Sequence, residues 1–159
     1  MAQLELSRVP EMTTAMLIRR PPSDVFEAFV NPEITSKFWF SRGSARLEVG
    51  KPVKWDWEMY GMSIEVQAKV IDPHRRIVIE WPSYKGQTTV EWTFEPLATG
   101  TFVNVSERGF TGTGDELVKQ VTDSGEGFSL VLAGAKALLE HDVKLNLVPD
   151  RFPKGLPKH

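Results

Sequence analysis

The sequence contains no cysteine, which excludes disulfide bonds, thiolate metal sites and catalysis by a thiol. Long apolar runs are missing as well, since no stretch approaches the roughly 20 residues that cross a bilayer. Residues 1–10 are interrupted by Glu5, Arg8 and Pro10, so they lack the apolar core of a signal peptide. These absences predict a cytoplasmic protein that is neither secreted nor bound to a membrane.

Excess charge of either sign is also lacking, because 19 lysine and arginine residues stand against 21 aspartate and glutamate residues. This balance gives no electrostatic reason to expect a nucleic acid or an anionic membrane as a partner. With 41% hydrophobic and 25% charged residues, the 159-residue chain has the composition of a folded protein. Its length predicts one domain over residues 1–159, with residues 145–159 as a proline-containing tail.

The N-terminal part predicts a short strand followed by two short helices. The strand covers residues 13–18, and the prolines at 21–22 then open a helix whose apolar face includes Val25, Phe26 and Phe29. The second helix begins at Asn31, a favourable N-cap, and runs toward residues 38–40 before a turn at 41–43.

After this turn the hydrophobic period changes from that of a helix to that of a strand. Alternating segments are expected at residues 45–49, 53–59, 62–70, 77–81, 90–94 and 103–105. Short polar turns separate them, so the strands form an antiparallel meander with one buried face. With the first strand, the sheet has about six or seven strands.

The last regular element is an amphipathic helix with an apolar stripe from Phe128 to Leu139. The stripe extends back to Leu117, but residues 123–127 interrupt it. Either Asp123 caps a new helix or one long helix bends at the glycines, and we favour a bent or two-part helix. The tail over 149–157 is predicted to be non-helical, with Leu147, Phe152 and Leu156 docking it in part.

Strands followed by a long helix define an α+β protein in which the helix covers one face of the sheet.

Tyrosine is scarce, with two residues, whereas the chain has five tryptophans and nine phenylalanines. Strand parity places six large side chains on the inner face: Trp55, Trp57, Met59, Trp81, Trp92 and Phe94. Trp39, at the end of the second helix, is expected to close one rim. These rings either line a pocket for a small hydrophobic molecule or fill the core, and periodicity alone does not distinguish the two.

Several segments resemble one known family in their order along the chain. They read IRRPPSDVFEAF at 18–29, NPE at 31–33, WF at 39–40, LEVG at 47–50, DPHRRIV at 72–78 and SERGF at 106–110. With the final apolar stripe, they resemble the family of activator of heat-shock-protein-90 ATPase homologue-like proteins. That family belongs to the START-like, or birch-pollen-allergen-like, helix-grip superfamily, also called SRPBCC and polyketide cyclase-like.

The resemblance implies a helix-grip fold, in which a curved antiparallel sheet surrounds a long C-terminal helix with a cavity between them. The candidate ligand-binding residues are then Trp39, Trp55, Trp57, Met59, Trp81, Trp92, Phe94, Glu107, Phe110, Phe128 and Leu132. No cofactor is expected.

Glu107 is the one charged residue among these candidates. It continues the inward parity of Val103 and Val105, at a place where related proteins often hold a histidine. A carboxylate in an apolar cavity is a candidate acid, base or hydrogen-bond anchor. Alternatively, the strand has ended and Glu107 pairs with Arg108 or solvent.

The remaining sequence patterns give weaker indications of function. His74, His141 and His159 have no partners at metal-ligand spacing, so we expect no metal site. The loop at 109–115 is rich in glycine, but no lysine and hydroxyl pair follows it as in a phosphate-binding loop. It is better interpreted as a connection to the last helix and a candidate lid. No nucleophilic triad is indicated.

Three hypotheses follow, of which the first is a non-catalytic protein that binds a small hydrophobic molecule. The second is a cyclase- or hydrolase-type enzyme that uses Glu107. The third, implied by the family, is a co-chaperone that stimulates a chaperone ATPase. Monomer and homodimer both remain open.

Overall fold

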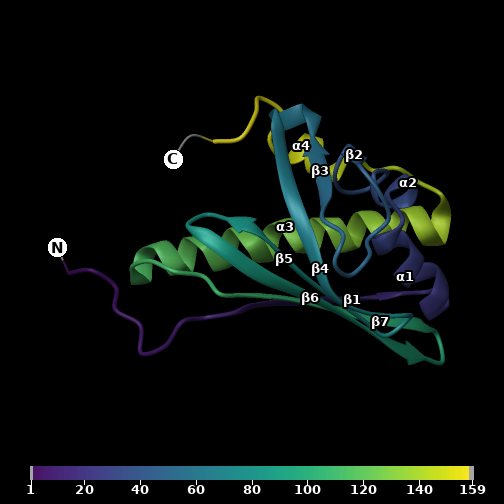
Figure 1. Ribbon diagram of the computed structural model, residues 1–159, viewed down its shortest axis with the longest axis horizontal. Helices are drawn as coiled ribbons and strands as arrows, with labels where there is room; N and C mark the ends of the chain where they lie inside the picture. The colour runs from purple at the N-terminus through teal and green to yellow at the C-terminus, as the bar shows by residue number, and fades with distance from the viewer. Residues whose placement is uncertain (1, 158–159) are drawn as a thin grey trace.

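Seven antiparallel strands form one sheet over the part of the chain that the structure, a computed structural model, describes, namely residues 2–157 (Figure 1). The strands are β1 (Met12–Ile18), β2 (Arg42–Gly43), β3 (Val53–Trp57), β4 (Met62–Asp72), β5 (Arg76–Ser83), β6 (Gly86–Leu97) and β7 (Gly100–Arg108). Their order is β1-β7-β6-β5-β4-β3-β2, so the chain meanders from β2 to β7 and β1 joins the β7 edge. The predicted α+β class and strand number are confirmed.

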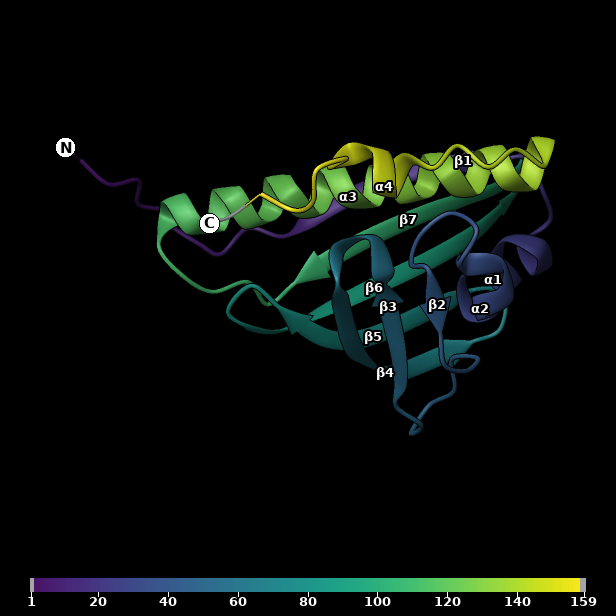
Figure 2. The same ribbon diagram turned by 90° about the horizontal axis from the view of Figure 1, so that it is seen from above.

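The helices lie on one face of this sheet. They are α1 (Pro22–Val30), α2 (Pro32–Thr35), α3 (Gly114–His141) and α4 (Leu147–Arg151). Figure 2 shows α3 lying along β1, with α1 and α2 near its C-terminal end. The curved sheet and long C-terminal helix form the predicted helix-grip arrangement, and the core lies between them.

The long helix α3 starts earlier than expected and is continuous. Thr113 accepts a hydrogen bond from the backbone N–H of Glu116, and the Glu116 carboxylate accepts one from the backbone N–H of Thr113. This capping box satisfies N–H groups that the first turn leaves unpaired. The alternative in which Asp123 caps a separate helix was wrong, because α3 runs unbroken from Gly114 to His141. Asp123 instead accepts a hydrogen bond from Lys119, one turn earlier. The two glycines of the predicted interruption, Gly125 and Gly127, cost only about 1 kcal/mol each relative to alanine, which burial of the apolar stripe outweighs.

Two strand predictions were also wrong. Residues 45–49 form only isolated bridges, and the short strand β2 lies at Arg42–Gly43, where a turn was expected. The next strand ends at Trp57, because residues 58–60 form a 3₁₀ turn that Gly61 closes in the left-handed conformation, with φ of 60°. Met59 therefore points away from the core and is 38% exposed.

The tail beyond α3 docks against the body, as predicted, but it is partly helical. Proline is tolerated in the first turn of α4, where its missing N–H would have no partner, so Pro149 does not prevent the helix. The Tyr60 hydroxyl donates to the Val148 carbonyl, and the Tyr60 and Phe152 rings lie 6.3 Å apart. Leu156 does not join this contact and remains 45% exposed.

Candidate functional site

Seven aromatic rings meet between the sheet and α3, and we call them the Trp39 cluster. Its members are Trp39, Phe40, Trp55, Trp57, Trp81, Trp92 and Phe128. The centroid of the Trp39 ring lies 5.0 Å from that of Trp55, 5.5 Å from that of Phe128 and 6.0 Å from that of Trp92. These are ordinary distances for edge-to-face and tilted pairs. The rings therefore contact one another and fill this part of the interior.

Regular elements hold five of these seven rings. Trp55 and Trp57 point inward because they alternate along β3 with Lys54 and Asp56. On the helix side of the Trp39 cluster, Phe128 belongs to the buried stripe of α3. The remaining two strand residues of the cluster are Trp81 on β5 and Trp92 on β6.

Trp39 differs from them, because it lies on the irregular segment between α2 and β2. Helix α2 ends at Thr35, and the backbone N–H of Trp39 donates to the Thr35 carbonyl at 3.0 Å. Trp39 was expected at a rim, yet its ring is the centre of the cluster and only 7% exposed. Regular helix ends at Thr35, and the hydrogen-bonded turns that follow it place the Trp39 side chain among the rings of the sheet and α3.

The other candidate residues are distributed around the cluster. Phe94 is buried but packs against Phe26 and Phe29 of α1, at 5.7 and 6.1 Å between centroids. Phe110 and Leu132 are fully buried in the same core. Met59 is outside the site for the reason given above.

Glu107 lies at the edge of the cluster with its carboxylate buried, since the residue is 2% exposed. One oxygen, Oε1, accepts a hydrogen bond from the Ser124 hydroxyl at 2.6 Å. The other, Oε2, accepts from the Thr88 hydroxyl at 2.5 Å and from Trp81 Nε1 at 3.0 Å. All three donors are neutral. The inward interpretation of Glu107 therefore holds, and Arg108 pairs with Glu91 instead.

Sequence reasoning missed Thr88 and Ser124, the two hydroxyl partners of Glu107. Thr88 precedes Val90 by two residues on β6 and so shares its inner face. Ser124 precedes Phe128 by four residues, which places both on one face of α3. The spacing of both residues indicated an inward position. They were missed because threonine and serine are polar and were not counted among the core residues.

The turn between β5 and β6 lies beside this polar edge. Tyr84 is half-exposed there, and loss of hydration together with the carboxylates of Asp123 and Glu107 raises the pKa of its hydroxyl to about 12. Lys85 forms a salt bridge with Glu116 at the start of α3. Gln120 of α3 donates to the carbonyl of Thr111, which anchors the loop before the helix. Both chain segments at this end of the site are thus tied to α3.

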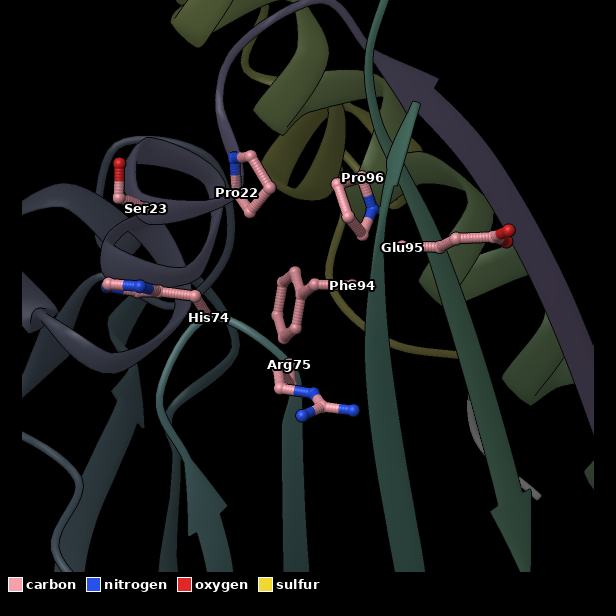
Figure 3. A pocket seen from close by; sticks show the side chains of 7 residues that line it. All are labelled: Pro22, Ser23, His74, Arg75, Phe94, Glu95 and Pro96. Atoms are coloured by element: carbon pink, nitrogen blue, oxygen red, sulfur yellow. The ribbon is translucent and has the colours of Figure 1, made fainter. Parts of the chain in front are cut away.

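Two surface pockets lie away from the Trp39 cluster. One, of about 680 Å³, is lined by Pro22, Ser23, His74, Arg75, Phe94, Glu95 and Pro96. Figure 3 shows the Phe94 ring at its centre, between Pro22 and Arg75. The other, of about 390 Å³, lies beside Val49 and Ala68. Phe29 contacts both Phe94, which lines the first pocket, and Trp92 of the cluster.

The two histidines within residues 2–157 lie in separate places. His74 lies in the β4–β5 turn with its ring 5.5 Å from that of Phe26, and His141 is the last residue of α3. His159 lies outside the described residues. Within residues 2–157, no three histidine, aspartate or glutamate side chains gather as a metal site would need. In the same range, no helix is both long and apolar enough to cross a membrane.

A curved antiparallel sheet closed by one long helix, with an aromatic layer between them, defines a helix-grip protein. The chain belongs to the family described as activator of Hsp90 ATPase homolog 1-like protein, whose model matches residues 19–140. This confirms the family predicted from the sequence. None of the curated proteins compared with the chain matches it.

Solved structures agree with this assignment. The protein SSP2350 of Staphylococcus saprophyticus is 30% identical, with a TM-score of 0.76 over 86% of this chain and 96% of that one. The Aha1 dimer of Colwellia psychrerythraea is 17% identical, with a TM-score of 0.70 over 83% of this chain and 97% of that one. DynU16, a protein of the dynemicin biosynthetic locus, is 17% identical, with a TM-score of 0.70 over 84% of this chain and 48% of that one.

Proposed function

We propose that this protein binds a small, planar hydrophobic molecule in the space that the Trp39 ring occupies. The observation that carries the proposal is that Trp39 is at once the centre of the aromatic cluster and a residue on an irregular segment. Its neighbours Trp55, Trp92 and Phe128 are held by strands and α3. Rotation of the Trp39 side chain out of the cluster would leave a flat, aromatic-walled site while Ser41 keeps its hydrogen bonds to Asp56 of β3.

The energetics of this exchange are favourable to a flat ligand. Each aromatic pair contributes about 0.5–1.5 kcal/mol beyond the burial of its area. A ligand with an aromatic frame restores the ring contacts that Trp39 gives up, whereas a flexible aliphatic chain restores only apolar burial. The proposal thus predicts selectivity for planar molecules over alkyl chains of the same size.

Glu107 adds a polar edge to this apolar site. A buried carboxylate costs free energy unless its oxygens are hydrogen-bonded, so a core built only for stability gains little from it. Here Ser124, Thr88 and Trp81 supply three neutral donors. The same carboxylate can accept a hydrogen bond from a ligand hydroxyl once a donor such as Ser124 rotates away.

The comparisons support a binding role at the level of the fold. Likeness to DynU16 shows the shared fold, and the place of that protein in a biosynthetic locus is consistent with a small-molecule partner for this chain. That the small molecule is planar and hydrophobic is part of our proposal.

Fluorescence titration of the five tryptophans with a set of planar aromatic and aliphatic compounds tests the proposal. Saturable changes with planar compounds support it, and Phe128→Leu is expected to weaken their binding about tenfold, equal to about 1.4 kcal/mol. Phe152→Leu is the matched control, because Phe152 contacts Tyr60 outside the cluster. Absence of saturable binding by every planar compound would overturn the proposal.

A catalytic role of Glu107 is the second candidate, favoured by burial of this carboxylate beside the proposed site. An enzyme of the cyclase or hydrolase type would lose turnover in Glu107→Gln while still binding its substrate. A co-chaperone role is the third, favoured by the family and by the likeness to an Aha1 dimer. A chaperone ATPase assay with and without this protein tests it, and an unchanged rate counts against it.

A further inference from the structure

Trp92 carries a hydrogen-bond donor that has no acceptor. The residue is 1% exposed, and its Nε1 atom is the one buried side-chain nitrogen or oxygen without a partner among residues 2–157. Buried donors in native proteins are nearly always paired, and an unpaired one costs free energy. Trp81 shows the contrast within the same cluster, because its Nε1 donates to both Thr88 and Glu107.

The unpaired donor is carried by a ring of the Trp39 cluster, which forms the proposed ligand site. The Trp92 ring lies 6.0 Å from the ring of Trp39 and 6.0 Å from that of Phe128. It shares the inner face of the sheet with Glu107, because β6 pairs Trp92 with Val105 and Val90 with Glu107. Trp92 and Glu107 are thus diagonal neighbours on adjacent strands, a spacing that long side chains bridge. The sheet thus presents a donor and an acceptor on the same inner face, beside the Trp39 ring.

We infer that the ligand is a neutral, planar aromatic molecule carrying an oxygen acceptor, such as a ring carbonyl, that accepts a hydrogen bond from Trp92 Nε1. The inference rests on the proposed function and narrows it from planar hydrophobic molecules in general to one chemical class. The ligand is neutral because the rings of the Trp39 cluster offer no cationic side chain to pair with an anion, and burial of an unpaired charge is costly. Paired with the ligand, the Trp92 donor no longer carries the cost of being buried alone.

The test compares 9-fluorenone with fluorene, two neutral tricyclic molecules of nearly equal size that differ in one carbonyl oxygen. Wild-type protein labelled with ¹⁵N is titrated with each, and the five indole N–H resonances are followed, with that of Trp92 assigned by triple-resonance experiments. We expect fluorenone to bind about three- to tenfold more tightly, the range that one net hydrogen bond supplies. The Trp92 indole proton should shift downfield with fluorenone and not with fluorene.

Two variants sharpen the comparison. Trp92→Phe removes the donor and keeps an aromatic ring, so it should bring the two affinities to equality. Trp57→Phe is the matched control: it also removes one indole from the cluster, and it should keep the preference for fluorenone even where both affinities fall. If Trp92→Phe does not fold, the wild-type affinities and indole shifts decide the question by themselves.

The outcomes separate this inference from the proposed function. Equal binding of both compounds, or equal shifts of the Trp92 resonance, would overturn the carbonyl inference and leave planar hydrophobic binding intact. Such a result would mean that a neighbouring aromatic face serves as a weak acceptor for this N–H. Failure of both compounds to bind saturably would overturn this inference together with the function on which it rests.

Discussion

Lys85, in the turn between β5 and β6, forms a salt bridge with Glu116 in the first turn of α3. The Glu116 carboxylate also accepts the backbone N–H of Thr113 and so completes the capping box. One carboxylate therefore starts the long helix and ties a hairpin tip to it. The tie lies at the same end of the molecule as Tyr84 and the polar edge around Glu107.

The free energy of unfolding should depend on pH through the Glu116 carboxylate. Hydrogen bonds from Lys85 and Thr113 lower the pKa of Glu116 from 4.5 to about 2. Because the folded-state pKa is lowered, the stabilisation is present above pH 4.5 and is lost as the pH falls toward 2. Urea unfolding should show Glu116→Gln to be less stable than wild type at pH 7, with the difference vanishing near pH 2.

A double-mutant cycle separates the two partners. Lys85→Met should remove part of the effect of Glu116→Gln, and the remainder belongs to the capping box with Thr113. A Glu116→Gln effect that stays constant between pH 7 and pH 2 would contradict the role assigned to its charge.

At alkaline pH, the raised pKa of Tyr84 should make the free energy of unfolding fall as the pH rises. The pKa of its hydroxyl is raised to about 12, whereas an unfolded tyrosine ionises near pH 10. Stability is therefore complete below pH 10 and is lost as the pH rises from 10 to 12, because only the unfolded chain ionises readily there. Tyrosinate absorbance resolves this group by comparison of wild type with Tyr84→Phe, which leaves Tyr60 to titrate. Ionisation of Tyr84 near pH 10 would show that its hydroxyl is fully hydrated.

The fold was largely predictable because strand parity and helical stripes are local signals. Trp55 and Trp57 face inward as their alternation with Lys54 and Asp56 indicates. The same alternation continues to Met59 in the sequence, but the chain has already turned toward Gly61 there. Periodicity in the sequence records residue type and does not record where the backbone leaves the sheet.

The centre of the site was not predictable from these signals. Trp39 lies on an irregular segment, and no period specifies the direction of its side chain. Likewise, Thr113 with Glu116 and Asp123 with Glu126 present the same capping pattern, and only the first forms. The choice depends on tertiary burial, since Ser124 and Phe128 must continue one stripe with Leu117.

Truncation of the central ring should have a large and informative cost. Trp39→Ala removes a ring that contacts six others, so the free energy of unfolding should fall by about 3–5 kcal/mol. Trp39→Phe should cost less, because a ring remains. Fluorene should stabilise Trp39→Ala more than wild type, because it no longer has to displace the indole, and thermal unfolding with and without the compound measures this. If Trp39→Ala lowered the free energy of unfolding by less than about 1 kcal/mol, the central position of the ring would be contradicted.

Glu107→Gln tests the polar edge with almost no change in volume. The amide of glutamine replaces one acceptor oxygen by an NH₂ group, so a hydroxyl that now donates to that oxygen must rotate to accept instead, and its own O–H loses this acceptor. We expect the free energy of unfolding to fall by about 1–3 kcal/mol, measured by urea unfolding. Thr88→Val in the same background should recover part of the loss, because it removes one of the competing donors, whereas Thr89→Val on the neighbouring position should not. Equal effects of the two valine substitutions would mean that the carboxylate contributes nothing specific through this network.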